Sequence, residues 1–211
     1  MNFFKKLFSS KKQTEKQVPK HPQEASKTVS KNNDQTKKGE VKEIFTTEYF
    51  DKRYTEDRID EFILDGCLKI IKGFYIDTNI EQKIENPLNH PINLDQVIED
   101  GMGFHMYCKA FNLADKETTM YLALAFADYM IKTFDFKLYQ DSEPEFPLRA
   151  MTIKYDKNQT VMSLYPIEYA LKVLNNQATF EDMHSKVKTH LESMPDMNDL
   201  LNQFMNKDKD S

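Results

Sequence analysis

The stretch Met120–Phe134, with the sequence MYLALAFADYMIKTF, decides the fold, and eight apolar residues in a row open it. If the stretch is helical, the polar and small residues in and around it fall on one narrow stripe, at Glu117, Tyr121, Ala125, Asp128, Lys132 and Asp135. All other positions then face protein, which predicts a central core helix whose stripe faces water. The stretch is too short and too interrupted by charge to cross a bilayer, which requires about 20 apolar residues.

Two further helices are predicted upstream of this stretch, over residues 56–75 and 94–111, because their apolar residues recur at steps of three and four. Four of the chain's five glycines lie inside them, at Gly66, Gly73, Gly101 and Gly103. Glycine within a helix costs about 1 kcal/mol relative to alanine. We therefore interpret these glycines as places where another backbone comes close. A short helix ending at Arg53 is predicted near the start of the folded body.

After Phe134 the pattern changes from a helical period to alternation. Three short segments, 136–140, 148–155 and 160–165, are rich in β-branched and aromatic residues, and the turn DKNQ at 156–159 joins the last two. Two more helices are predicted, over 166–174 and 180–192. The sequence thus predicts a mostly helical, single α+β domain over residues 44–206, with a small three-stranded antiparallel sheet and a disordered tail at 207–211.

The charges divide the chain into a basic beginning and an acidic remainder. Residues 1–43 carry 11 lysines against five acidic residues, whereas residues 44–211 carry 18 basic and 29 acidic ones. Residues 9–43 also lack phenylalanine, tyrosine and tryptophan and contain few aliphatic side chains. Such a segment cannot bury enough apolar surface to offset the entropy lost on ordering. We therefore expect residues 9–43 to be a disordered basic linker.

The first eight residues, MNFFKKLF, form a distinct amphipathic segment. On a helix its apolar side chains gather on one face beside two lysines, and the residues concerned are Phe3, Phe4, Lys5, Lys6, Leu7 and Phe8. A helix this short forms only against another surface. An anionic membrane is one candidate, because aromatic rings enter the interface and each lysine adds about 1 kcal/mol of attraction. A groove on a protein partner is a second, and a frayed terminus without a role is the third.

Motifs that carry catalysis or bind cofactors are not found. The chain has no glycine-rich phosphate loop, no C-x-x-C pair, no H-E-x-x-H run and no G-x-S-x-G elbow. His105 and Cys108 are three residues apart on a predicted helix, but two ligands are only half of a zinc site. We interpret them as a core histidine beside a core thiol, and we predict no catalytic residue, cofactor or metal. Cys67 and Cys108 fit buried thiols of a reducing cytoplasm better than a disulfide framework.

The part of the chain from Met120 to about Leu191 resembles a family of uncharacterised bacterial domains. The resemblance consists of an apolar helix, a strand FKLY at 136–139, a loop containing acids and prolines, a second strand, the step LYP at 164–166 into a helix with Lys172 one turn on, and a closing helix. It implies an α+β fold and no catalytic activity. In general build the chain is also similar to bacterial immunity proteins, which block a toxin by binding it.

These observations favour a non-enzymatic, cytoplasmic binding protein whose acidic surface engages a protein partner, as a toxin-neutralising immunity protein does. The acidic loop at 141–147 supplies the candidate exposed carboxylates, Asp141, Glu143 and Glu145. The alternative is a peripheral membrane adaptor that is tethered to the inner face of the membrane by residues 1–8. Direct binding to nucleic acid is not expected, because the body of the chain is acidic.

Overall fold

The computed structural model describes residues 47–99, 103–141, 144–157 and 160–193. The chain divides into two compact units after Tyr49, and of the first unit only the three residues that begin the first described helix are included. The predictions made for residues 1–8 and 9–43, and for the tail at 207–211, lie outside the described residues.

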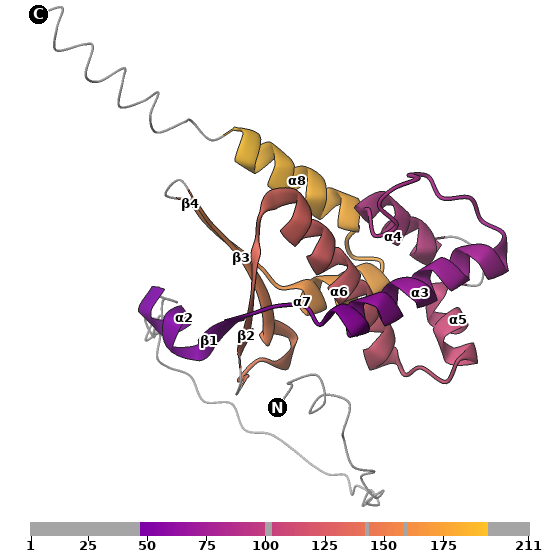
Figure 1. Cartoon of the computed structure of the whole chain (residues 1–211), viewed down its shortest axis with the longest axis horizontal. Coiled ribbons are helices and arrows are strands. Elements are labelled where there is room, and N and C mark those ends of the chain that lie inside the picture. The colour runs from indigo at the N-terminus through magenta and orange to yellow at the C-terminus, as the bar shows by residue number, and fades with distance from the viewer. Residues whose placement is uncertain (1–46, 100–102, 142–143, 158–159, 194–211) are drawn as a thin grey trace, which may run out of the picture. The chain divides into compact units, whose positions relative to one another are not determined.

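The described elements are helices and short strands, with four helices in succession between the first strand and the second. In chain order they are α2 (Thr47–Arg53), β1 (Tyr54–Asp57), α3 (Glu61–Thr78), α4 (Pro91–Glu99), α5 (Phe104–Ala110), α6 (Asp115–Phe134), β2 (Lys137–Asp141), the 3-10 turn η1 (Pro147–Arg149), β3 (Met151–Lys157), β4 (Thr160–Leu164), α7 (Pro166–Leu174) and α8 (Phe180–Glu192). The protein is therefore a mixed α+β structure, as the sequence predicted, with the strands gathered at one end of the second unit and α3, α4 and α5 at the other (Figure 1).

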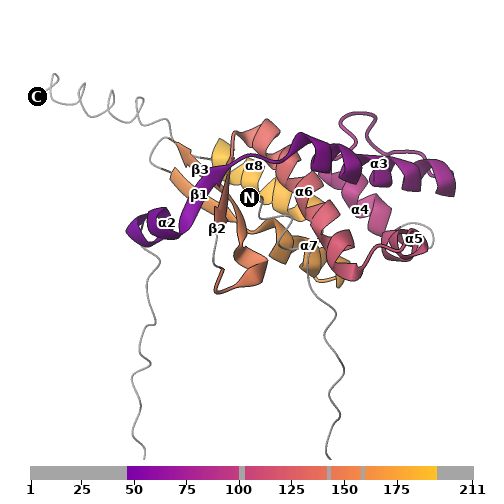
Figure 2. The ribbon, with the colours of Figure 1, turned by 60° about the horizontal axis from the view of Figure 1, so that its bottom comes forward.

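α6 is the central helix, which confirms the reading of Met120–Phe134. All residues from Thr118 to Met130 except Tyr121 are buried, and the helix contacts α3, α4, α5, α7, α8 and β3. It runs through the middle of the helices, with α3 on one side and α7 on the other (Figure 2). Burial of an apolar helix on this scale is the main source of stabilisation in the fold.

The prediction that one stripe of α6 faces water is wrong at its centre. Ala125 and Asp128 are buried, because the loop before α4 places Asn89 over them. The Asn89 amide donates to the carbonyl of Ala125 at 2.9 Å and to the Asp128 carboxylate at 3.0 Å. Lys132 donates to the same carboxylate at 2.9 Å. A buried carboxylate requires such partners, and here they convert the polar stripe into a packing surface.

The sheet has four antiparallel strands in the order β1-β2-β3-β4, so the predicted count of three is wrong. The predicted meander corresponds to β2, β3 and β4. The additional strand, β1, lies where the helix over 56–75 was expected to begin, and it pairs Glu56 with Tyr139. This strand has only four residues, and three of them are exposed. Its pairing partner is distant in sequence, so no local periodicity indicates it.

The two faces of the sheet have different coverings. Leu138, Ile153 and Leu164 lie side by side on one face, and α6 and α7 pack against β3. On the other face the Phe50 ring stacks on Tyr54, with the ring centroids 4.5 Å apart. The Lys154 ammonium lies 4.9 Å from the Phe50 ring centroid. Aromatic stacking and a cation–π contact therefore cover this face.

The boundaries of α3, α4 and α5 also differ from the prediction. The expected helix over 94–111 is two helices, α4 and α5, which are separated by residues 100–103. Gly103 has a φ of +76°, a conformation that favours glycine, and it precedes the first turn of α5. Gly101 lies outside the described residues. The two predicted helices therefore become three, and a glycine marks the break between the second and the third.

The interpretation that another backbone comes close at the glycines of α3 is wrong, because Gly73 has a side chain beside it and Gly66 has no close neighbour. A Cβ added at Gly73 would lie 2.8 Å from the hydroxyl of Tyr107, whereas a Cβ at Gly66 would meet nothing within 4 Å. Gly73 therefore makes room for a side chain of α5, and Gly66 lies on an open helix surface. Among the helices described, none has the length and apolar character required to cross a membrane.

Candidate functional site

The most unusual surface feature is an acidic segment, residues 56–65, which runs from β1 into the first turns of α3. Its sequence EDRIDEFILD contains five carboxylates and one arginine. In its middle, the Phe62 side chain is 86% exposed. The fold places it there because Asp60 caps α3 by accepting hydrogen bonds from the backbone of Phe62 at 2.9 Å and Ile63 at 3.2 Å. The Asp60 cap thus holds the backbone of Phe62, whose exposed ring has carboxylates on both sides of it in the sequence.

The ion pairs of the acidic segment are made with exposed lysines. Lys137 contacts Glu56 at 3.1 Å, and Lys69 contacts Asp65 at 2.7 Å. Both lysine side chains are more than half exposed. Pairs of this kind contribute about 0–1 kcal/mol, so they exchange readily for an incoming cation. The segment therefore remains electrostatically available to a basic partner.

A cavity of about 300 Å³ adjoins the acidic segment. Carboxylates of Glu56, Asp57 and Glu61 line it, together with Ile131 and Phe136. Arg58, Lys132 and Lys137 lie on the same lining, so its charge is mixed. Apolar walls combined with carboxylates match the stem and head of a long basic side chain.

A second groove, of about 490 Å³, lies between η1 and α7 and has the opposite charge. Arg149 and Lys172 both contact the carboxylate of Glu168, at 3.0 and 2.9 Å. The hydrogen bond from Lys172, and to a smaller extent that from Arg149, lowers the pKa of Glu168 below its usual value. Phe146 and Leu171 contribute exposed apolar surface to the groove. Two cations share one anion here, so this groove and the acidic segment suit different ligands.

A third cavity, of about 800 Å³, lies at the end of α3. Ile76, whose side chain is 66% exposed, lines it together with Ile80, Glu81 and Glu85. Its lining is again apolar and acidic. The two ends of α3 therefore present surfaces of similar chemistry, and the one at the start of the helix carries the larger apolar side chain.

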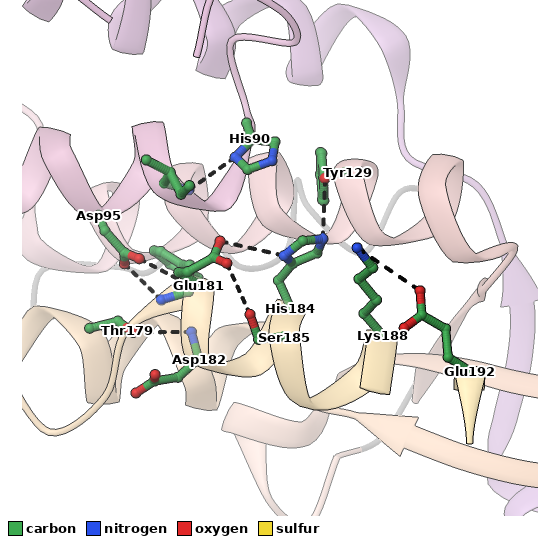
Figure 3. Close-up of polar contacts among 12 residues, drawn as sticks. His90, Asp95, Tyr129, Thr179, Glu181, Asp182, His184, Ser185, Lys188 and Glu192 are labelled. Atoms are coloured by element: carbon green, nitrogen blue, oxygen red, sulfur yellow. Dashed lines mark hydrogen bonds and ion pairs between the residues drawn. The ribbon is translucent and has the colours of Figure 1, made fainter. Parts of the chain in front are cut away.

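Half-buried titratable side chains cluster where α8 packs against α4 and α6 (Figure 3). His184 Nε2 lies 3.4 Å from the Tyr129 hydroxyl, and His184 Nδ1 lies 3.4 Å from Glu181 Oε2. The ring centroids of His90 and His184 are 5.6 Å apart. An acid, an imidazole and a hydroxyl in series resemble a catalytic relay. Tyr129 is buried, however, and these side chains line none of the three cavities above.

Asp95 of α4 holds the N-terminal end of α8 (Figure 3). Its carboxylate accepts hydrogen bonds from the backbone of Phe180 at 2.7 Å and of Glu181 at 2.9 Å. Burial raises the pKa of Asp95 to about 6, although the two backbone hydrogen bonds oppose that increase. Thr179 caps the same helix by accepting from the backbone of Asp182 at 3.1 Å. The first turn of α8 is thus held by polar groups from two elements.

The predicted acidic loop is arranged differently from the expectation that its acids are exposed. Asp141 is buried, so that part of the prediction is wrong, because Arg53 of α2 contacts its carboxylate at 2.9 Å. The same arginine contacts Glu145 at 3.2 Å. Glu143 lies outside the described residues. The structure brings Asp141 and Glu145 together around one cation, which reduces the charge they offer to a partner.

The histidine and thiols singled out from the sequence are not grouped into a site. The interpretation of His105 as a core histidine is wrong, because its side chain is 38% exposed and lies 3.3 Å from Asp115. Cys67 and Cys108 are buried free thiols. Burial raises the pKa of Cys67 to about 12 and also raises that of Cys108, so both stay protonated at neutral pH. In the described ranges, no three His, Cys, Asp or Glu residues are placed to hold a metal ion.

Sequence reasoning missed both Phe62 and the His90–His184 pair. Phe62 belongs to an apolar series of regular helical spacing, but the buried residues Cys67 and Ile71 continue the stripe of its neighbour Ile63, so Phe62 faces outward. The cluster around His184 unites residues 55 positions apart, and the Asp95 cap spans 85 positions. A cluster of carboxylates around an aromatic residue is visible in the sequence, whereas the histidine pair has no local signature.

Comparison of the chain with protein-family models, with curated proteins and with solved structures finds no match in any of the three.

Proposed function

We propose that this protein is a non-enzymatic binding protein whose acidic segment, residues 56–65, engages a basic protein partner. The observation that supports the proposal is the exposure of Phe62 among five carboxylates. Buried aromatic anchors supply much of the binding energy at protein interfaces. A ring of opposite charge around such an anchor speeds the encounter and selects the partner.

The adjoining cavity gives the proposed interface a second point of contact. A lysine or arginine of the partner enters it with its carbon stem against Ile131 and Phe136 and its charge beside Glu56 and Glu61. The partner is thus characterised by a basic side chain placed next to an apolar pocket that receives Phe62. A toxin neutralised by an immunity protein is one class of partner with these properties.

Site-specific photo-cross-linking in the native cell tests this function. A photoreactive phenylalanine analogue at position 62 is expected to cross-link a basic protein. The same analogue at Phe111, another exposed phenylalanine, serves as the matched control and is expected to capture none of it. Glu61→Lys combined with Asp65→Lys is expected to reduce the yield at position 62 at least about tenfold, because it reverses the local charge. Identical products from positions 62 and 111 would contradict the proposal.

If the partner is a toxin, adding the purified protein to it is expected to inhibit its activity in proportion to the complex formed. A Phe62→Ala variant is expected to inhibit less at equal concentration. Full inhibition by that variant would place the contact elsewhere, and the loop containing Glu143 and Glu145 is then the next candidate.

The second candidate function is a peripheral membrane adaptor, and the segment MNFFKKLF at 1–8 is the observation that favours it. Its three phenylalanines and two adjacent lysines combine interfacial aromatics with attraction to anionic lipid. Deletion of residues 1–12 separates the two functions. An adaptor loses its binding to anionic vesicles, whereas a protein-binding acidic segment keeps its affinity for the partner.

A further inference from the structure

His90 and His184 occupy unequal positions in the cluster beside α8, and the difference determines how each accepts a proton (Figure 3). His184 Nδ1 and Glu181 Oε2 are buried, and neither forms a hydrogen bond with a described residue. They face one another at 3.4 Å. A proton placed on this nitrogen is donated towards a carboxylate, which makes a charge-assisted contact out of two unsatisfied atoms. The protonated form of His184 therefore has a carboxylate opposite its Nδ1.

His90 is built to remain neutral. Its Nδ1 accepts a hydrogen bond from the backbone N–H of Ile92 at 3.2 Å, and its carbonyl accepts from Leu94 at 3.0 Å. It therefore acts as the N-cap of α4. A proton on Nδ1 removes the acceptor of the Ile92 bond and places a positive charge at the positive end of the helix dipole. Charging His90 thus weakens the start of α4.

The other groups around the pair do not compensate for a second positive charge. Tyr129 of α6 faces both imidazoles through its ring and hydroxyl. Asp128 of α6, next to Tyr129, is already engaged by Asn89 and Lys132. On α8, the Glu181 carboxylate faces His184 and also acts on His90. Asp95 of α4 is engaged by the first backbone N–H groups of α8.

We propose that His90 and His184 form a pH-operated latch on α8. The helix stays packed against α4 and α6 while at most one of the two imidazoles is charged, and it separates from them when both are charged. Two positive rings with centroids 5.6 Å apart then share one carboxylate. Separation uncovers the inner face of α8, which includes Phe180 and Val187, both buried in the docked state.

The pKa of His90 agrees with this arrangement. Burial lowers it below the usual value of 6.5, and the positive charge of His184 lowers it further, while Glu181 acts in the opposite direction. A base with a lowered pKa in the folded state stabilises the fold above its unfolded pKa, and this contribution is lost as the pH falls. The latch therefore opens on the acid side of neutrality.

Hydrogen exchange of the full chain tests the latch directly. After correction for intrinsic rates, amide protection of residues 180–192 is expected to fall at least about tenfold more than that of α6 between about pH 7 and about pH 5. His90→Asn keeps a capping acceptor but cannot titrate, and it is expected to reduce that loss to less than about twofold. His190→Gln, on the exposed side of α8, is the matched control and is expected to behave as the native chain. Equal losses in the native chain and in His90→Asn would overturn the latch.

A second measurement covers the case in which a variant is too unstable to interpret. Proton NMR titration follows the midpoint of the His90 imidazole in the native chain and in a variant that lacks the neighbouring ring. The His184→Gln variant is expected to raise the titration midpoint of His90 by at least about half a unit, because the neighbouring charge is gone. An unchanged His90 midpoint in the variant would refute the coupling on which the latch depends.

Discussion

α6 and α8 pack against one another, but they are held by different kinds of contact. α6 is buried along most of its length by apolar side chains from six other elements. α8 buries mainly Phe180 and Val187, and its first turn is held by the carboxylate of Asp95. Apolar packing is non-directional and insensitive to pH, whereas a helix held by titratable groups responds to pH. The comparison separates a helix held mainly by apolar packing, α6, from a helix whose attachment depends in part on titratable groups, α8.

The largest expected effect comes from removing a side chain of α6. Phe126→Ala in α6 is expected to lower the free energy of unfolding by about 3–5 kcal/mol, because Phe126 is fully buried against Phe180 and Tyr169. Chemical denaturation monitored by circular dichroism measures this change. Phe62→Ala is the matched control, and its effect is expected to stay within about 0.5 kcal/mol. Equal losses of unfolding free energy in Phe126→Ala and Phe62→Ala would contradict the role of α6 as the main apolar core.

A smaller and more local effect is expected at the polar attachment of α8. Asp95→Ala leaves the buried N–H of Phe180 and that of Glu181 without their acceptor, at a cost of about 1–3 kcal/mol. Asp95→Asn keeps one acceptor oxygen and is expected to recover part of this loss. Hydrogen exchange should locate the change in residues 180–192 for both variants. A uniform loss of protection over α6 as well would show that the two helices are not held separately.

The pH dependence contributed by Asp95 has the opposite sign to that of His90. Its pKa in the folded state, about 6, lies above the ordinary value of 3.8, so the folded state binds the proton more tightly than the unfolded chain does. Its contribution to stability is therefore largest below about pH 4 and declines as the pH rises through about 6. Asp95→Asn is expected to remove this decline, as measured by denaturation at several pH values. A steeper decline in the variant would show that the carboxylate is not the group responsible.

The smallest expected effects concern the two glycines of α3, where neither apolar burial nor a polar attachment dominates. Gly66→Ala is expected to raise the free energy of unfolding by about 0.5–1 kcal/mol, because the new methyl group meets nothing and alanine favours the helix. Gly73→Ala is expected to give no such gain, because its methyl group meets the Tyr107 hydroxyl at 2.8 Å. Thermal denaturation of both variants would measure the difference. Equal gains would mean that the Tyr107 side chain moves aside without a cost in stability.

Elements whose evidence is local were predictable from the sequence. The helical period around Leu122 and Phe126 located α6, and the alternation around Ile153, with the proline at Pro166, located the meander and the start of α7. Contacts between distant residues were not predictable. β1 has only four residues and is a strand because it pairs with β2. Asp141 is buried because Arg53, 88 positions earlier in the chain, contacts its carboxylate. The candidate site depends on which of the adjacent residues Phe62 and Ile63 faces the core, and their spacing alone does not decide between them.

The pairing of β1 with β2 has a consequence for the order in which the chain folds. The residues that this ladder joins are 81 to 87 positions apart, and Tyr54 and Asp141 are the most distant pair. Ribosomes add about 5–20 residues per second, so β1 emerges several seconds before the strand that completes it. During this interval its backbone is an open edge that another chain can pair with. Glu56 and Asp57 carry charges that disfavour such pairing, and they keep this role in the folded protein, because β1 remains an edge strand of the sheet.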